Sequence, residues 1–186
     1  MVGLDTEWFP DLLPGLHSKT AVLQLGFSHK CFVFSLIHMQ ACPQVVADLL
    51  GDASILKTGQ EVIYDVERME DDYGVSVNGL VELKDIADRN NLPKSSLADL
   101  YQLVTGEDMK KPRKVTMSNW EKKPLTSQQI SYAALDALVS RETLMGLHYI
   151  YGGHTNFMQW LLEQDFVMDQ RRPDKEKSDR WNSERS

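Results

Sequence analysis

The opening segment VGLDTEW, residues 2–8, restricts the possible folds before anything else is considered. Its apolar start is typical of a buried strand. Residues two apart on a strand point to the same face, so the carboxylates of Asp5 and Glu7 project side by side. Two adjacent acids at a strand end repel each other unless a cation lies between them, which predicts a divalent metal. Two solvated acids are the alternative interpretation, because a D-x-E pattern alone is common.

The first half of the chain continues with alternating strand and helix patterns. Two apolar runs, residues 21–27 and 31–36, are separated by a short polar turn and predict a hairpin. The next predicted elements are a short helix from Pro43 to Gly51, a fourth strand at 54–57, a helix at 61–73 and a fifth strand at 80–83. Strands that alternate with helices predict an α/β domain with a mixed five-stranded sheet flanked by helices.

The second half is predicted to be mostly helical. Ser96 and Thr126 each begin a capped helix, and the second of these runs to about His148. A final amphipathic helix contains Phe157, Trp160, Leu161 and Met168, and its apolar face is either core packing or a docking surface for a protein partner. We expect one domain over residues 1–164 and a disordered tail over 165–186, which has six acids and six bases.

Length and composition fit this single domain. The chain has 186 residues, 42% of them hydrophobic, and no apolar run long enough to span a membrane. Its two cysteines form neither a disulfide framework nor a metal-spaced pair, and its N-terminus does not resemble a signal peptide. We therefore expect an intracellular protein, nuclear or cytoplasmic.

The net charge of −7 argues against an anionic partner such as nucleic acid. The charge is unevenly distributed, however, because residues 110–123 contain six bases and one acid. This basic stretch is either a solvated loop or a binding segment, and its run KKPRK at 110–114 is also typical of a nuclear import signal.

Two further acids are candidates for the site predicted at Asp5 and Glu7. Asp136 lies in the middle of a helix rich in small apolar residues, where a buried carboxylate needs a partner. Tyr132 precedes it by four residues and so shares its helix face. Asp65 follows the fourth predicted strand. Four carboxylates suit two Mg²⁺ or Mn²⁺ ions better than zinc, which prefers His or Cys.

Three segments resemble the exonuclease motifs of the DEDD superfamily in order and spacing: VGLDTEW at 2–8, KTGQEVIYD at 57–65 and YAALDA at 132–137. The segment SNWE at 118–121, followed by PLT at 124–126, is similar to the branch containing ribonuclease D and the Werner-syndrome exonuclease domain. The resemblance covers roughly residues 1–150. Tyr132 implies the tyrosine subclass, because the histidine subclass would have its histidine where Ser131 stands.

The resemblance implies a ribonuclease H-like fold and hydrolysis from the 3′ end of single-stranded RNA or DNA, which releases nucleoside 5′-monophosphates. Two metals about 3.5 to 4 Å apart can hold both the attacking and the leaving oxygen. One ion would be held by Asp5, Glu7 and Asp136, with Tyr132 orienting its water or accepting the proton. The second would be held mainly by Asp5, with Asp65 nearby through water.

The chain also departs from the family pattern. The helix that usually precedes the first strand has no counterpart here, as expected of an excised domain or a shortened isoform. Glu61 and Tyr64 are bulkier than the residues usual around Asp65. A catalytically inactive nucleic-acid-binding or protein-binding module of the same fold is the alternative function, against which all four acids and Tyr132 argue. The tyrosine motif gives no support to a third possibility, a ribonuclease H-like endonuclease.

Binding of a single strand requires neutralised phosphates and supported bases. Lys111, Arg113 and Lys114 are the candidates for phosphate contacts. Thr6 and Trp8, next to the predicted metal ligands, are the candidates for contacts with the terminal nucleotide. For Trp8, stacking on a base and capping the core are equally compatible with the sequence.

Overall fold

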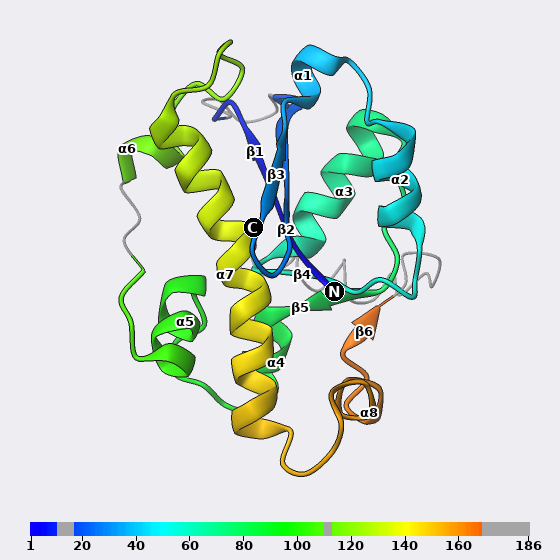
Figure 1. The fold of residues 1–186 in the computed structure, drawn as a ribbon, viewed down its shortest axis with the longest axis vertical. Helices are drawn as coiled ribbons and strands as arrows, with labels where there is room; N and C mark the ends of the chain where they lie inside the picture. The colour runs from blue at the N-terminus through cyan, green and yellow to red at the C-terminus, as the bar shows by residue number, and fades with distance from the viewer. Residues whose placement is uncertain (11–16, 110–112, 169–186) are drawn as a thin grey trace.

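The computed structural model, which describes residues 1–10, 17–109 and 113–168, contains a mixed six-stranded sheet with helices on both faces (Figure 1). The strands are β1 (Val2–Trp8), β2 (Thr20–Gly26), β3 (Cys31–Phe34), β4 (Lys57–Gly59), β5 (Leu80–Glu82) and β6 (Val167–Met168). The helices are α1 (Leu36–Met39), α2 (Gln44–Gly51), α3 (Val62–Tyr73), α4 (Leu83–Arg89), α5 (Leu97–Thr105), α6 (Arg113–Thr116), α7 (Ser127–Tyr151) and α8 (Phe157–Glu163).

The sheet order β3-β2-β1-β4-β5-β6 places β1 in the middle. On one side β1 pairs antiparallel with β2 along nearly its whole length. On the other side it pairs with the parallel strand β4 only at Val2 and Gly3. The half of β1 that carries the acids therefore extends beyond β4, at the point where the strand directions change. Open α/β sheets bind their ligands at such points.

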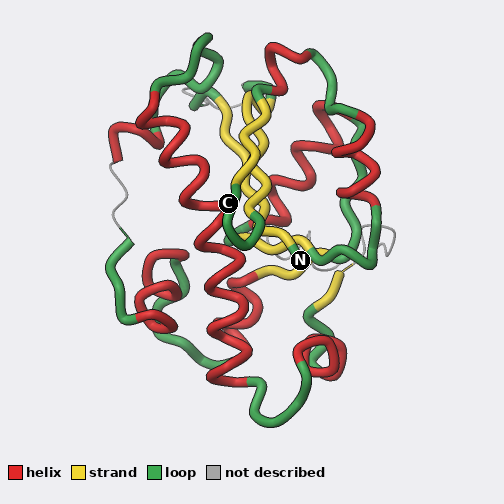
Figure 2. The backbone as a smooth tube through the Cα atoms, viewed as in Figure 1, coloured by secondary structure: helices red, strands yellow, loops and turns green. Residues whose placement is uncertain are grey.

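Two layers of helices enclose the sheet (Figure 2). Because strand residues alternate between faces, Leu4 and Leu25 pack against α2 and α3, and Val22 packs on the other face with residues of α7. A further apolar cluster joins α4, α5 and α8 to the second half of α7. The helix α7 thus contacts both the sheet and the helical half of the molecule.

Glycines let α7 approach the sheet unusually closely. A Cβ atom added at Gly3 of β1 would lie 1.7 Å from the carbonyl oxygen of Ala137, and one at Gly26 of β2 would lie 2.6 Å from it. The two glycines are paired across the strands, so together they form a flat surface for the backbone of α7. Asp136 directly precedes Ala137, so this contact also fixes the distance between Asp136 and β1.

The structure confirms the predicted α/β fold and its antiparallel hairpin, β2–β3, but corrects the strand count from five to six. The missed strand, β6, pairs with Leu80 and Val81 of β5. The predicted tail therefore begins too early, because Phe166 is buried and Met168 belongs to this strand rather than to the final helix. A two-residue strand has no periodicity that a sequence pattern can reveal. The rest of the predicted tail, residues 169–186, lies outside the described residues.

The fourth strand occupies Lys57–Gly59 rather than residues 54–57. Its polar residues concealed it, although Lys57 is fully buried and its ammonium donates to the carbonyls of Asp52 and Asn78. The final helix α8 buries Trp160 and Leu161, as core packing requires, and leaves Leu162 exposed. Its role as a docking surface for a protein stays a prediction.

Substituting Gly3→Ala tests the close contact with α7. The added methyl group overlaps the Ala137 carbonyl, so we expect the free energy of unfolding in urea to fall by about 3 kcal/mol or more. Gly51→Ala is the matched control, because a Cβ there would lie 3.8 Å from its nearest neighbour. Equal stability of the two variants would show that α7 can move away from the sheet at no cost.

Candidate active site

Three of the predicted acids converge where α7 crosses β1. Carboxylate oxygens of Asp5, Glu7 and Asp136 all lie within 4.8 Å of one another. Asp5 and Glu7 come from one face of β1, as the strand alternation predicts, and Asp136 comes from the buried face of α7. Glu7 and Asp136 are buried and Asp5 is half-buried. This group, called the acid triad below, concentrates negative charge in a small volume.

The surroundings of the acid triad suit a hydrated hard cation. All three side chains offer oxygen ligands, the type that Mg²⁺ and Mn²⁺ prefer. Gln24 of β2 is in register with Asp5, and cross-strand partners share a face of the sheet. Its amide is fully buried, and neither its nitrogen nor its oxygen has a hydrogen-bond partner among the described residues. The triad and its neighbour therefore offer ligands for an ion and polar groups for its water.

Tyr132 lies one turn before Asp136 on the same face of α7, and only 7% of it is exposed. Burial and the negative charge of Asp136 raise the pKa of its phenol well above the usual value. The negative charges of Glu7 and Asp5 also raise the pKa of this phenol. The hydroxyl oxygen accepts a hydrogen bond of 3.0 Å from Thr116. At neutral pH this tyrosine keeps its proton.

The segment before α7 is fastened to the start of that helix. Trp120 is completely buried, its ring lies 6.0 Å from that of Tyr132, and its Nε1 donates to the carbonyl of Thr116. Gln129 donates to the side chain of Ser118 and to the carbonyl of residue 119. Gln129 also completes the predicted capping box with Thr126. The motif residues around Trp120 therefore fix this segment.

Asp65 is not part of the acid triad. Its carboxylate accepts a 2.6 Å hydrogen bond from Thr6, which points to the face of β1 opposite to Asp5 and Glu7. Burial raises the pKa of Asp65 to about 8, while the Thr6 hydrogen bond acts against this and Glu82 adds to it. The role of Asp65 as a metal ligand stays a prediction. The side chain of Thr6 is buried and donates to Asp65, and the role of Thr6 as a nucleic-acid contact stays a prediction.

Glu82, which the sequence analysis missed, holds the start of α3. Its Oε1 accepts from the backbone N–H groups of Glu61 at 2.9 Å and Lys84 at 3.0 Å, and Oε2 accepts from Ile63 at 3.5 Å. Burial raises the pKa of this carboxyl to about 7. Helix N-termini leave N–H groups without intrahelical partners, and one carboxylate here serves both α3 and α4. In the sequence, the signal for this role is the position of Glu82 shortly before a helix.

Trp8 forms an aromatic and cationic cluster at the end of β1. The guanidinium of Arg68 lies 4.2 Å from the centre of the Trp8 ring, and the ring of Tyr64 meets it edge-on at 5.7 Å. Arg68 also donates to the Tyr64 hydroxyl and to the carbonyl of Ser18. One face of the Trp8 ring is therefore covered by protein, and Tyr64 is 36% exposed beside it.

Comparison with known proteins supports the arrangement of these motifs. A model of the 3′-5′ exonuclease family matches residues 1–148. The chain belongs to the DEDD superfamily of 3′-5′ exonucleases. The match covers the strand that carries Asp5 and Glu7 and the part of α7 that carries Tyr132 and Asp136. It confirms the family inferred from the three sequence motifs.

Two curated relatives of this DEDD exonuclease chain illustrate the match. The chain is 35% identical over 143 residues to a 3′-5′ exonuclease of Arabidopsis thaliana, covering 75% of this chain and 49% of that protein. It is 37% identical over 140 residues to the bifunctional 3′-5′ exonuclease/ATP-dependent helicase WRN of Mus musculus, covering 74% and 10%. The chain therefore spans half or less of the length of both relatives.

Solved structures confirm the ribonuclease H-like fold of the DEDD exonuclease chain. Brucella melitensis NrnC superposes with a TM-score of 0.71 at 21% identity, covering 89% of this chain and 80% of that one. Escherichia coli RNase D superposes with a TM-score of 0.66 at 18% identity, covering 88% and 44%. No helix in the described ranges of the DEDD exonuclease chain is long and apolar enough to cross a membrane.

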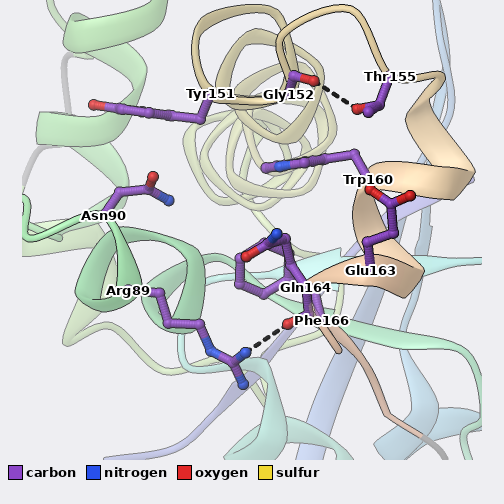
Figure 3. A pocket seen from close by; sticks show the side chains of 9 residues that line it. All are labelled: Arg89, Asn90, Tyr151, Gly152, Thr155, Trp160, Glu163, Gln164 and Phe166. Carbon is purple, nitrogen blue, oxygen red and sulfur yellow. Dashed lines mark hydrogen bonds between the residues drawn. The ribbon is translucent and has the colours of Figure 1, made fainter.

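The basic candidates of this DEDD exonuclease chain lie on or next to α6. Lys111 lies outside the described residues, Arg113 is the first residue of α6, and the side chain of Lys114 is exposed. A pocket of about 220 Å³ lies elsewhere, where α4, α8 and the turn after α7 meet, and Figure 3 shows its lining. Arg89 and Trp160 line it, and none of the predicted site residues does. The family motifs and this pocket are separate features.

A thermal-shift titration tests metal binding by the acid triad. An ion present at about a hundred times its dissociation constant stabilises the folded state by about 2.7 kcal/mol, or roughly 5–10 °C for a chain of this size. We expect Mn²⁺ to raise the melting temperature of the wild type, and Asp136→Asn to lose this response. Without metal, Asp136→Asn should be more stable than the wild type, because residue 136 then carries no charge that repels the other two acids. Asp48→Asn, on the exposed surface of α2, should respond as the wild type does; an unchanged response of Asp136→Asn would contradict the assignment.

The raised pKa of Asp65 predicts how stability depends on pH in the presence of a chelator. Between about pH 4 and pH 8 the folded chain keeps a proton on Asp65 that the unfolded chain has released. The free energy of unfolding therefore decreases as pH rises through this window and levels off above it. Asp65→Asn retains an acceptor for Thr6 and removes the charge. The free energy of unfolding of this variant, minus that of the wild type, should therefore be larger above pH 8 than near pH 5. Parallel curves for the two proteins would contradict the prediction.

Proposed function

We propose that this chain is a metal-dependent 3′-5′ exonuclease that hydrolyses single-stranded RNA or DNA from the 3′ end and releases nucleoside 5′-monophosphates. One observation carries the proposal: Asp5, Glu7 and Asp136 converge within 4.8 Å in a chain whose residues 1–148 match the exonuclease family. An inactive module of the same fold has no need to retain three mutually repelling, largely buried carboxylates, which cost stability without a cation.

The acid triad would hold Mg²⁺ or Mn²⁺, which lowers the pKa of a bound water and neutralises charge on the phosphate. Glu7 and Asp136, both buried, supply oxygen ligands on rigid elements, so little reorganisation is needed. Tyr132 keeps its proton and can donate a hydrogen bond that orients the attacking water. A second ion would be held mainly by Asp5, with Asp65 nearby through water.

The nucleic acid would meet two surfaces beside the triad. Lys111, Arg113 and Lys114 would neutralise phosphates from the α6 side. On the other side of β1, the partly exposed ring of Tyr64 beside Trp8 would support the terminal base, because bases stack on the faces of aromatic rings whatever their sequence. We infer an intracellular site of action, nuclear or cytoplasmic, from the unpaired cysteines at positions 31 and 42.

Digestion of 5′-labelled single-stranded RNA and DNA with Mg²⁺ or Mn²⁺ tests this function. Removal of one triad carboxylate costs about 3 kcal/mol or more of charge stabilisation, so we expect Asp5→Asn and Asp136→Asn to be at least about 100-fold slower than the wild type. The control Asp48→Asn should retain the wild-type rate. A ladder that shortens one nucleotide at a time from the 3′ end is the expected product.

Two results of the same assay would contradict the proposal. Fragments cut at internal positions from the first time point would indicate an endonuclease. Binding of the labelled strand without metal-dependent degradation would indicate the inactive module. Comparing the two polymers at equal concentration also determines whether the 2′-hydroxyl of RNA matters.

A further inference from the structure

The hydroxyl of Tyr132 is shared between two segments of the chain. Its ring belongs to α7, but its oxygen accepts a 3.0 Å hydrogen bond from Thr116, the last residue of α6. Thr116 matches none of the acidic or tyrosine positions on which the family motifs depend. Its side chain is exposed, so the bond forms at the surface edge of the site rather than within the core.

The charges around Tyr132 determine the direction of this bond. A phenol has one proton to donate, whereas its oxygen can also accept. Asp136, Glu7 and Asp5 all act on this phenol electrostatically, and their negative charge attracts its proton toward the triad. The lone pairs of the oxygen are then available on the side of Thr116. Thr116 therefore donates to Tyr132, and the phenol proton is directed to the side where the acids lie.

Thr116 is held in place by the segment that follows it. The carbonyl of Thr116 accepts from Nε1 of Trp120, which is completely buried against Tyr132. Gln129 of α7 fixes the intervening residues through Ser118. The donor and the tyrosine thus belong to one assembly, and the same short helix α6 includes Lys114, a candidate phosphate contact.

We propose that Thr116 is a positioning residue for Tyr132, which holds the phenol so that its proton is donated toward the acid triad and the attacking water. The inference rests on the proposed exonuclease function, which it deepens. Because Thr116 is on α6, contact of a nucleic-acid strand with this helix would act on the orientation of the tyrosine through the same hydrogen bond. Strand binding and water orientation would then be coupled through one side chain.

The hydrogen bond itself can be tested without measuring activity. In protein labelled with ¹³C at the tyrosine Cζ atoms, the signal of Tyr132 is the one missing from the Tyr132→Phe variant. We expect this signal to shift in Thr116→Val, which keeps the side-chain shape and removes the donor, and to return to its wild-type position in Thr116→Ser. Thr105→Val, at the exposed end of α5, is the matched control and should leave the signal unchanged.

The positioning role predicts a particular kinetic pattern. Loss of one neutral hydrogen bond corresponds to about a 3- to 10-fold change, so kcat of Thr116→Val should fall by that factor while KM stays within about twofold. Thr116→Ser, which keeps the hydroxyl donor, should have the kcat of the wild type. In a Tyr132→Phe background the valine substitution should have no further effect, because the group that Thr116 positions is then absent.

Three results would overturn the proposal. An unchanged Tyr132 signal in Thr116→Val would show that the hydrogen bond does not form. An unchanged kcat would show that the bond does not position the tyrosine for the reaction. If Thr116→Val lowered kcat by the same factor in the Tyr132→Phe background, Thr116 would act on the substrate directly. If the wild type degrades neither polymer, the exonuclease proposal fails by itself, and the Tyr132 signal still decides whether Thr116 holds the phenol.

Discussion

Backbone contact between α7 and the centre of the sheet is the constraint on which the site depends. Gly3 and Gly26 leave no side chain between the strands and the Ala137 carbonyl, so the helix lies almost directly on the backbone of β1 and β2. A larger distance between α7 and the sheet would move Asp136 away from Asp5 and Glu7, and the acid triad would lose one of its three members. The glycines therefore act on the chemistry although neither carries a functional group.

The two faces of β1 accommodate buried acids in different ways. On the α7 face, Asp5, Glu7 and Asp136 are close enough that a divalent cation is the natural counter-charge. On the α3 face, Asp65 and Glu82 are neutralised in part by proton uptake and satisfied by hydrogen bonds from Thr6 and backbone amides. A single seven-residue strand thus separates three acids that could hold an ion from two acids that the protein itself satisfies with hydrogen bonds.

Short-range patterns made much of this predictable. The D-x-E alternation places Asp5 and Glu7 together, and the i, i+4 spacing places Tyr132 beside Asp136, because both follow from local geometry. What could not be predicted depends on distant partners. Nothing near Asp65 in the sequence reveals Thr6, 59 residues earlier, and nothing near Tyr132 marks Thr116 as its donor. The strand β6 was missed for the same reason, since only its pairing with β5 defines it.

The carboxylate of Glu82 also connects regions that seem unrelated. It ends the strand β5, whose preceding residues pair with β6 near the C-terminal end of the described chain, and it holds the first amides of α3, the helix of Asp65. Truncation at residue 164 would look harmless because it removes no motif. It would nevertheless expose the edge of β5 and loosen the strand that anchors α3. The outermost strand of the sheet thus contributes to the alignment of the nuclease motifs.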